Sequence, residues 1–217
     1  MLSLISTPIG NLKDITQRAL EKLSSCDYIL CEDTRRTRIL LNHYGIKTPL
    51  KSFHKFSEAK KEGLIIDELQ EGKMIALVSD AGTPAIADPG VRLVMRCRQE
   101  GIEVETIPGP CALIAAVSIS GFATHRFQFV GFLPRKSGQL KKQLEEILAY
   151  EGTTICYESP YRLVKVLQAL AEIDPEKEVA VARELTKKFE ELYKGPCKKI
   201  LEHYSNKPPK GEIVLIL

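Results

Sequence analysis

The sequence of 217 residues predicts an α/β protein built from two α/β domains. Short apolar runs with the length of buried strands alternate with segments of helical spacing along the chain. In the first half this alternation is typical of a mostly parallel sheet covered on both faces. Pro108-Gly109-Pro110 interrupts it, because two prolines around a glycine cannot continue a helix or a strand. We therefore expect one domain over residues 1–108 and a second over residues 109–217.

The composition is that of a soluble globular protein, with 44% hydrophobic and 27% charged residues. No apolar run approaches the roughly 20 residues that span a bilayer, and no signal peptide is evident, so we expect a cytoplasmic protein without a membrane partner. The six cysteines are scattered without a CxxC pair, which predicts reduced and mostly buried thiols. The four histidines lack metal-ligand spacing, so no metal site is expected. A net charge of +3 is too small to identify a partner.

The elements of the first domain follow from apolar spacing and turn residues. A strand over Leu2–Ile5 leads into a turn over Thr7–Asn11. Further strands are expected over Tyr28–Cys31, Pro49–Phe53, Met74–Ser79 and Ile102–Ile107. The helices expected between them are one with apolar residues from Leu12 to Leu23, one carrying Ile39, Leu40 and Leu41, and one from Pro89 that Gly101 closes. An amphipathic helix is expected over Glu58–Gln70, with Leu64, Ile65 and Leu69 on one face.

The stretch from Leu77 to Gly90 is the candidate floor of a cofactor site. Its small residues, among them Gly82 and Ala85, leave the backbone bare enough for a flat ligand, and ligands of open α/β sheets bind beyond the carboxyl ends of the strands. Asp88 is expected to cap the next helix, with Pro89 at its first position. The alternative is an ordinary strand-to-helix loop that binds nothing.

A second polar cluster, Glu32-Asp33-Thr34-Arg35-Arg36-Thr37, follows the Tyr28–Cys31 strand. Its acids, hydroxyls and arginines stand where a sheet of this kind presents its chemistry. The alternative is a helix cap made by Asp33 or Thr34. Both interpretations can hold together.

The second domain begins with CALIAAVSIS, residues 111–120, which is apolar on every side and predicts a buried helix. Its small residues either pack on the sheet or let a ligand approach closely. The other expected elements are strands over Phe127–Gly131, Thr153–Tyr157, Val179–Ala182, Phe189–Tyr193 and Ile213–Leu217, a helix over Leu140–Leu148, and a helix capped by Ser159-Pro160 that runs through Leu170.

Several familiar chemistries have no motif here. The sequence has no GxGxxG for a Rossmann-type site, no GxxxxGK[ST] for a nucleoside triphosphate and no GxSxG for a serine hydrolase. Basic residues gather in pairs such as Arg135-Lys136 and Lys187-Lys188. Such pairs either form a solvated face or, if they share one face, suit a phosphate backbone.

Seven ordered motifs cover almost the whole chain: STPIGNLKDIT, CEDTRRT, LVSDAGTPAIADPG, IPGPCALIAAVS, FQFVGFLPRK, CYESPYRL and VARELTKKFEELYKG. In this combination the sequence resembles the bacterial ribosomal RNA small subunit methyltransferase I family of the tetrapyrrole methylase superfamily. The resemblance implies two α/β domains with the cofactor cleft between them, unlike a Rossmann methyltransferase, and usually a homodimer. It also implies transfer of a methyl group from S-adenosylmethionine to the ribose 2′-hydroxyl of a cytidine in 16S rRNA, on the assembled 30S subunit.

Carried over by motif, the resemblance also implies a set of donor-binding residues. These are Pro8, Asp80, Gly82, Thr83, Ile86 and Cys111, followed by Ala112, Tyr157, Ala182, Gly211 and Glu212. The family's chains usually continue past the last motif into a short helical tail, whereas this sequence stops at Leu217, so a substrate contact made by such a tail is in doubt.

A ribose hydroxyl is a poor nucleophile until its proton begins to leave, so a base or acceptor is expected beside it. The candidates are Asp33, Glu158 and Glu184, each at the end of an expected strand. Asp33 and Glu184 are preferred because nearby cations could hold phosphates of the substrate: Arg35, Arg36, Arg183 and Lys187. A structural salt bridge or helix cap is the alternative role for each acid.

Two other functions stay open at the level of the sequence. One is methylation of a small molecule such as a tetrapyrrole, whose carboxylates also attract arginines. The other is a ribosome assembly factor that keeps the fold without activity. Binding of S-adenosylmethionine separates the assembly factor from both enzymes.

Overall fold

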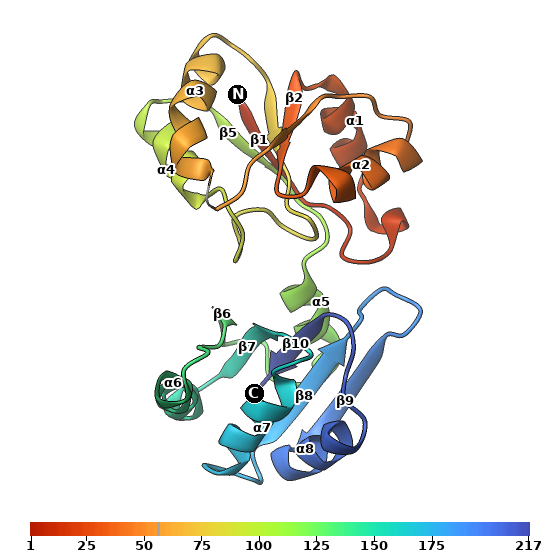
Figure 1. Ribbon diagram of the computed structural model, residues 1–217, viewed down its shortest axis with the longest axis vertical. Helices are drawn as coiled ribbons and strands as arrows, with labels where there is room; N and C mark the ends of the chain where they lie inside the picture. The colour runs from red at the N-terminus through yellow and green to blue at the C-terminus, as the bar shows by residue number, and fades with distance from the viewer. Residues whose placement is uncertain (56) are drawn as a thin grey trace. The chain divides into compact units, whose positions relative to one another are not determined.

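The computed structural model describes residues 1–55 and 57–217 and divides into two compact units, Met1–Cys111 and Ala112–Leu217 (Figure 1). Each unit is built on its own five-stranded sheet, and among the described residues the buried apolar side chains form two clusters in unit 1 and one in unit 2. The predicted α/β class is therefore confirmed.

The sheet of unit 1 is parallel throughout. Its strands are β1 (Leu2–Ile5), β2 (Tyr28–Cys31), β3 (Leu50–Ser52), β4 (Ile75–Leu77) and β5 (Val104–Ile107), in the order β3-β2-β4-β1-β5. Leu2 of β1 pairs with Ile75 of β4 on one side and Val104 of β5 on the other. Because every strand runs in the same direction, the loops after β1, β2, β4 and β5 leave from one edge of the sheet.

Helices cover both faces of this sheet, as the sequence predicts (Figure 1). Residues of α1 (Gln17–Ser25) and α2 (Thr34–His43) pack in one core with Ile5, and residues of α3 (Glu58–Gln70) and α4 (Val91–Gln99) pack in another with Leu2. Successive side chains of a strand point to opposite faces, so an apolar strand of four residues can serve two cores.

Local capping explains where α1 and α2 begin. The Thr16 hydroxyl accepts a hydrogen bond from the Ala19 amide at 3.1 Å, and Asp33 accepts one from the Arg35 amide at 2.8 Å. A separate 3₁₀ turn over Leu12–Asp14 precedes Thr16, so the helical spacing read from Leu12 onward begins too early. The bounds of α3 agree with the prediction, but Leu64 is 62% exposed and lies off the buried face.

The predicted start of α4 is wrong. The helix begins at Val91 with Gly90 at the N-cap, while Asp88 and Pro89 belong to the preceding turn. The Gly90 amide donates to a carboxylate oxygen of Glu58 at 3.2 Å, so a side chain from α3 does what Asp88 was expected to do. Gly90 also approaches Leu77 so closely that an added Cβ would lie 2.5 Å from its Cδ2.

The sheet of unit 2 is mixed. Its strands are β6 (Phe127–Phe132), β7 (Thr153–Glu158), β8 (Glu178–Arg183), β9 (Glu191–Pro196) and β10 (Ile213–Ile216), in the order β6-β7-β10-β8-β9. Only β6 and β7 pair in parallel. The core packs under α6 (Ser137–Ala149), α7 (Leu163–Ala171) and α8 (Cys197–Asn206), whereas α5 (Ala112–Ser120) contacts β7, β8 and β10 outside that core.

Three expectations for unit 2 need correction. Ile114 and Ile119 of α5 are each about half exposed, so this helix is not buried on every side. The helix α7 begins at Leu163 and is not capped by Ser159-Pro160. Ser159 instead forms a turn in which its carbonyl accepts a hydrogen bond from the Arg162 amide at 2.9 Å. Finally, α8 was not predicted.

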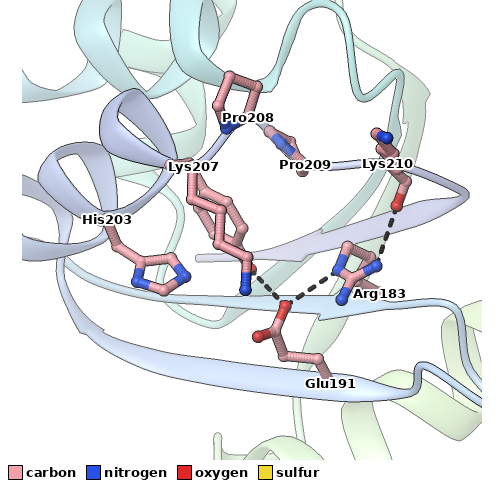
Figure 2. Close-up of a pocket in the computed structure, with 8 residues that line it drawn as sticks. Arg183, Glu191, His203, Lys207, Pro208, Pro209 and Lys210 are labelled. Atoms are coloured by element: carbon pink, nitrogen blue, oxygen red, sulfur yellow. Dashed lines mark hydrogen bonds and ion pairs between the residues drawn. The ribbon is translucent and has the colours of Figure 1, made fainter.

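Unit 2 contains a cavity of about 360 Å³ beside β8, β9 and α8 (Figure 2). It is lined by Arg183, Glu191, His203, Tyr204, Lys207, Pro208, Pro209 and Lys210. Among the described residues, no helix is long and apolar enough to cross a membrane.

Candidate active site

The loops after β1 and β4 are joined by backbone pairing at the edge of the unit 1 sheet. The Thr7 amide donates to the Gly82 carbonyl and the Gly82 amide to the Thr7 carbonyl, both at 2.9 Å. The Thr7 hydroxyl also donates to the Ser79 carbonyl at 3.2 Å. This pairing fixes the small-residue loop predicted to hold a cofactor against the loop that carries Pro8.

The loop after β5 joins the same cluster through side-chain hydroxyls. Ser6 and Thr83 lie 3.1 Å apart through their hydroxyl oxygens, and the Thr83 hydroxyl donates to the Pro110 carbonyl at 3.3 Å. At Gly109, a Cβ would lie 3.0 Å from the Cβ of Ser6, a tight contact that glycine avoids, so the two loops can approach closely. Three loops from three neighbouring strands therefore form one polar surface.

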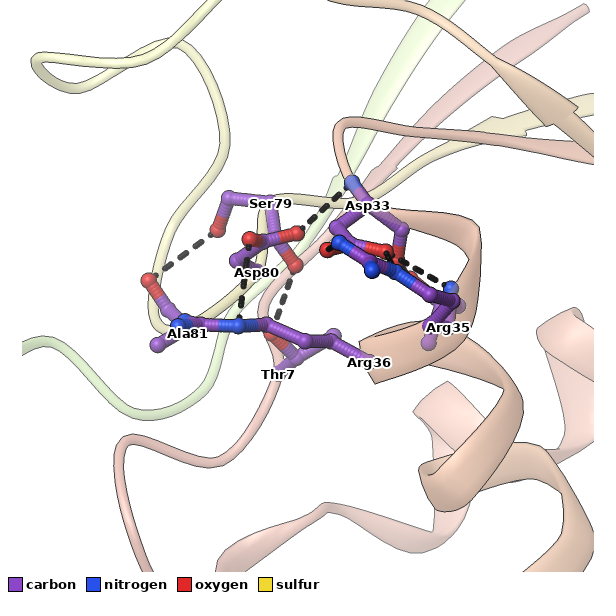
Figure 3. A network of polar contacts seen from close by, with 8 residues as sticks. Thr7, Asp33, Arg35, Arg36, Ser79, Asp80 and Ala81 are labelled. Atoms are coloured by element: carbon purple, nitrogen blue, oxygen red, sulfur yellow. Dashed lines mark hydrogen bonds and ion pairs between the residues drawn. The ribbon is translucent and has the colours of Figure 1, made fainter.

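Asp80 links this surface to the start of α2 (Figure 3). One carboxylate oxygen accepts from the Asp33 amide at 2.9 Å, and the other lies 3.7 Å from Nε of Arg36. Asp33 in turn binds Arg35, whose Nε and Nη2 donate to its two oxygens at 3.0 and 2.7 Å. The hydrogen bonds from Arg35 lower the pKa of Asp33 to about 2, so its carboxylate is ionised and weakly basic at neutral pH.

The rest of the loop after β4 is strained and acidic. Ala85 and Ala87 have positive φ angles of 66° and 63°, and the Ile86 side chain between them is 41% exposed. Such conformations are disfavoured for residues with a Cβ and gather at ligand sites. Burial, together with the charges of Glu32 and Asp80, raises the pKa of Asp88 to about 6. The carboxyl groups of Glu32, Asp80 and Asp88 thus lie close enough for their charges to interact.

In unit 2, the candidate residues of β7 and β8 meet across β10. Tyr157 and Ala182 both pair with Val214, and Glu158 and Arg183 both pair with Ile213. The antiparallel pairing of β10 brings its first residues to the carboxyl ends of β7 and β8. Tyr157 also packs edge-on against Phe129, with ring centroids 4.8 Å apart, whereas Ala182 is fully buried.

Glu184 anchors the segment before β10. Its Oε1 accepts from Nζ of Lys187 at 2.9 Å and from the Glu212 amide at 3.0 Å. Burial alone would raise the pKa of Glu184, but these hydrogen bonds outweigh it and keep the pKa below its usual range. At Gly211, whose φ is +88°, an added Cβ would collide with the Glu184 carboxylate, so that side chain would have to move.

Glu158 differs from the other two acids. Its side chain is fully buried, and burial raises its pKa despite the Ser159 amide at 2.7 Å and Arg162 at 3.4 Å. Among the described residues, Oε2 of Glu158 has no hydrogen-bond partner. Arg162 also donates to the Leu133 and Pro134 carbonyls. The carboxyl group is therefore the most basic of the three and the least accessible to a substrate.

Each of the four predicted phosphate-binding cations already has a carboxylate beside it. Arg35 binds Asp33, Arg36 faces Asp80, and Arg183 binds Glu191 at 2.9 Å. Lys187 lies 2.9 Å from both Glu184 and Glu212. A phosphate would compete with these partners, most easily at Arg35, whose side chain is 89% exposed.

The structure thus brings together Pro8, Asp80, Gly82, Thr83 and Asp33 within unit 1. In unit 2 it brings together Tyr157, Glu158, Ala182, Glu184 and Glu212. Cys111 and Ala112 stand at the end of one unit and the start of the next, both half-buried. Ser6, Thr7 and Ser79 were not among the predicted site residues, although two of the ordered motifs contain them, because a single hydroxyl residue in a turn does not reveal its hydrogen-bond partner.

Comparison with known sequences identifies relatives over the full chain. The profile of the family Tetrapyrrole (Corrin/Porphyrin) Methylases matches residues 1–201. The ribosomal RNA small subunit methyltransferase I of Thermotoga maritima is 48% identical over 217 residues, which are all of this chain and 97% of the relative. The enzymes of the same name from Haemophilus influenzae and Escherichia coli O157:H7 are 46% and 47% identical over all of this chain and 78% and 77% of their own lengths.

Solved structures with low sequence identity share the fold. A diphthine synthase superposes with a TM-score of 0.76 at 14% identity, covering 100% of this chain and 88% of its own. A cobalt precorrin-4 methyltransferase gives a TM-score of 0.70 at 19% identity, covering 99% of this chain and 93% of its own.

Proposed function

Because the chain belongs to the ribosomal RNA small subunit methyltransferase I family of the tetrapyrrole methylases, we propose that it methylates the ribose 2′-hydroxyl of a cytidine in 16S rRNA. The methyl donor we propose is S-adenosylmethionine, and the acceptor is the assembled 30S subunit. The observation that carries the proposal is the polar surface formed by the loops after β1, β4 and β5 in a chain so similar to these relatives.

The residues of this surface fit such a donor. Gly82 presents backbone without a side chain, Ile86 offers exposed apolar area, and Asp80 offers a carboxylate to hydroxyl or amino groups. The negative charges of Glu32, Asp80 and Asp88 favour a cation, and the donor carries its electrophilic methyl group on a positively charged sulfur. The predicted donor contacts in unit 2, Tyr157, Ala182, Gly211 and Glu212, stay predictions, as does a homodimer.

We assign the orientation of the ribose hydroxyl to Asp33. Its carboxylate sits at the N-terminus of α2, next to Asp80, and is ionised. Holding the ribose hydroxyl in line with the methyl–sulfur bond of the donor lowers the activation barrier by several kcal/mol, on the order of the effect of intramolecular alignment. When a substrate phosphate takes Arg35 away, the pKa of Asp33 rises toward its ordinary value and its basicity grows. The proton that the ribose hydroxyl loses on methylation passes to solvent.

Glu184 and Glu158 are less suited to this role. Oε1 of Glu184 accepts from Lys187 and the Glu212 amide. Lys187 is 27% exposed and held by a second carboxylate, so a phosphate displaces it less easily than the exposed Arg35 beside Asp33. Glu158 has the higher proton affinity, but its side chain is fully buried beside Arg162. We propose that both acids hold the local structure of unit 2.

The test is a transfer assay with radiolabelled S-adenosylmethionine. Isolated 30S subunits from cells that lack the enzyme, free 16S rRNA and a tetrapyrrole mixture are offered as separate acceptors. We expect label on the 30S subunits, and nucleoside analysis should place it on the 2′-oxygen of a cytidine. Label on the tetrapyrroles alone, or no label on RNA despite measurable donor binding, would contradict the proposal.

A further inference from the structure

The cavity of unit 2 carries an excess of positive charge that the proposed reaction does not use. Arg183, Lys207 and Lys210 line it together with a single carboxylate, Glu191. Arg183 and Glu191 are paired at 2.9 Å, and the Tyr204 hydroxyl lies 3.4 Å from the same carboxylate oxygen. The paired charges cancel, so the two lysines set the sign of the cavity.

Neither lysine forms an ion pair among the described residues, although the charge of Lys207 is close enough to help lower the pKa of Glu191. In residues 1–55 and 57–217, no carboxylate lies within ion-pair distance of the ammonium group of Lys207 or Lys210. Both side chains are exposed. Pro208 and Pro209 stand between them, and because proline fixes φ, the segment that carries the lysines has few conformations to lose when a ligand binds.

The guanidinium of Arg183 retains donors for an anion. Its Nε binds Glu191 and its Nη1 donates to the Lys210 carbonyl at 3.2 Å, as Figure 2 shows. For Nη2, the part of the chain that the structure describes provides no acceptor. A phosphate entering the cavity could therefore accept from Arg183 without breaking its pair with Glu191.

The walls also suit what a phosphate of a nucleic acid carries beside it. The rings of His203 and Tyr204 line the cavity, and Tyr193 packs against His203 with centroids 4.6 Å apart. A volume of about 360 Å³ is at the lower end of small-ligand sites, which suits one nucleotide. We propose that this cavity binds a backbone phosphate of the RNA substrate and the nucleoside next to it, a site separate from the polar surface of unit 1. This inference rests on the proposed function, because it takes RNA as the acceptor.

The test compares Lys207→Gln/Lys210→Gln with the unaltered protein in binding to isolated 30S subunits over a range of salt concentrations. Removing phosphate contacts should lower the slope of log affinity against log salt by about 1 to 2 and weaken binding roughly tenfold at low salt. The matched control is Lys47→Gln/Lys165→Gln, which removes the same charge from exposed lysines that have no ion pair among the described residues. The control should retain the unaltered slope.

Two further measurements make the outcome decisive. Donor binding and the thermal midpoint should be unchanged in both variants, which shows that they fold. Binding of free cytidine monophosphate to each variant tests the cavity directly. Equal salt slopes for the two double variants would overturn the inference, as would a loss of nucleotide binding in the cavity variant with unaltered 30S binding. If one of these two results is found while the unaltered protein methylates 30S subunits, the proposed function stands and only the role of the cavity in RNA binding is wrong.

Discussion

The Asp33 carboxylate caps α2 and pairs with Arg35, and one substitution separates the cap from the charge. Asparagine caps helices about as well as aspartate. Asp33→Asn should therefore leave stability within about 0.5 kcal/mol, as for most surface changes. If the charge orients the ribose hydroxyl, methyl transfer to 30S subunits should fall roughly 10²-fold or more, within the usual range for a positioned acceptor. Single-turnover transfer and urea unfolding measure the two effects.

The comparison variant is Asp33→Ala, which loses both the cap and the charge. It should cost about 1 kcal/mol of stability, the usual value of a cap, with a similar loss of transfer. If Asp33→Asn transfers methyl groups at the unaltered rate, Asp33 is only a cap and its catalytic assignment is wrong.

Asp88 makes folding depend on pH. Its pKa in the folded chain, about 6, lies above the ordinary aspartate value near 4, so the folded chain holds this proton more tightly. The free energy of unfolding should therefore fall as the pH rises from about 4 to about 6 and stay level above that. Asp88→Asn should be more stable at pH 8 by on the order of 1 to 3 kcal/mol, with little gain at pH 4. Urea unfolding at both values provides the measurement.

Asp67→Asn is the control for this prediction, since Asp67 is an exposed residue of α3 in the same unit. It removes the same charge from the chain as a whole. A gain at pH 8 that is equal in the two variants would show that net charge, and not the environment of Asp88, is responsible.

At the scale of elements, the loop after β4 depends on Gly82. Its φ of +86° is a left-handed conformation that costs a residue with a Cβ about 1 to 2 kcal/mol. An added Cβ would lie 3.4 Å from Ile9 and 3.8 Å from the Pro110 carbonyl, which is close but not a collision. Gly82→Ala should therefore fold with a modest loss of stability. Because strain at Gly82 displaces its pairing with Thr7, donor affinity by calorimetry should fall about tenfold, as for a loss of 1.4 kcal/mol.

Gly72→Ala has a matching backbone cost away from this loop. Gly72 has a φ of +92°, and in residues 1–55 and 57–217, its two chain neighbours aside, no atom lies within 4 Å of its Cβ position. The two variants should lose similar stability, but only Gly82→Ala should lose donor affinity. Equal donor affinities would remove Gly82 from the binding surface.

Elements whose ends depend on local residues could be predicted from the sequence. The bounds of α3 and of the first two strands follow from apolar periodicity and turn residues, and both are encoded within a few positions. The start of α4 could not be predicted, because its first amide is satisfied by Glu58, a residue 32 positions away. The prediction that Leu64 lies on the buried face of α3 was wrong, because spacing alone does not show which side chains at the edge of an apolar face are covered.

For the site, the sequence indicated which loops matter but not how they are joined. The Thr7 and Gly82 pairing, the bond from Thr83 to Pro110 and the shared partner Val214 all depend on strand order. Strand order is a tertiary property that no local motif contains. The cavity lysines escaped notice for the same reason, since Lys207 and Arg183 meet only after β8 and β10 pair.

At the scale of the whole molecule, each unit has a separate core, and buried thiols can report on each one. Cys97 in unit 1 and Cys156 in unit 2 are fully buried, and burial raises the pKa of both thiols. Leu93→Ala removes a fully buried side chain next to Cys97 in the unit 1 core and should cost about 2 to 5 kcal/mol. When thiol labelling is measured over a series of urea concentrations, labelling of Cys97 should begin at a lower urea concentration in Leu93→Ala than in the unaltered protein. The labelling curve of Cys156 should change little.

Leu64→Ala makes the same chemical change at a side chain that is 62% exposed. It should move neither labelling curve by more than about 0.5 kcal/mol, the usual range for surface positions. If Leu93→Ala shifts the Cys156 curve as much as the Cys97 curve, the two cores unfold as one cooperative body.

The place of β10 in its sheet governs the order in which the chain can fold during synthesis. Because β10 lies between β7 and β8, each of those two strands lacks one of its two neighbours until β10, the last strand of the unit, has left the ribosome. In unit 1, β4 likewise lies between β2 and β1, but every strand of that unit precedes residue 108, so its sheet does not depend on β10. A nascent chain can thus complete its first half early, while the second half waits with two unpaired strand edges that invite chaperone binding.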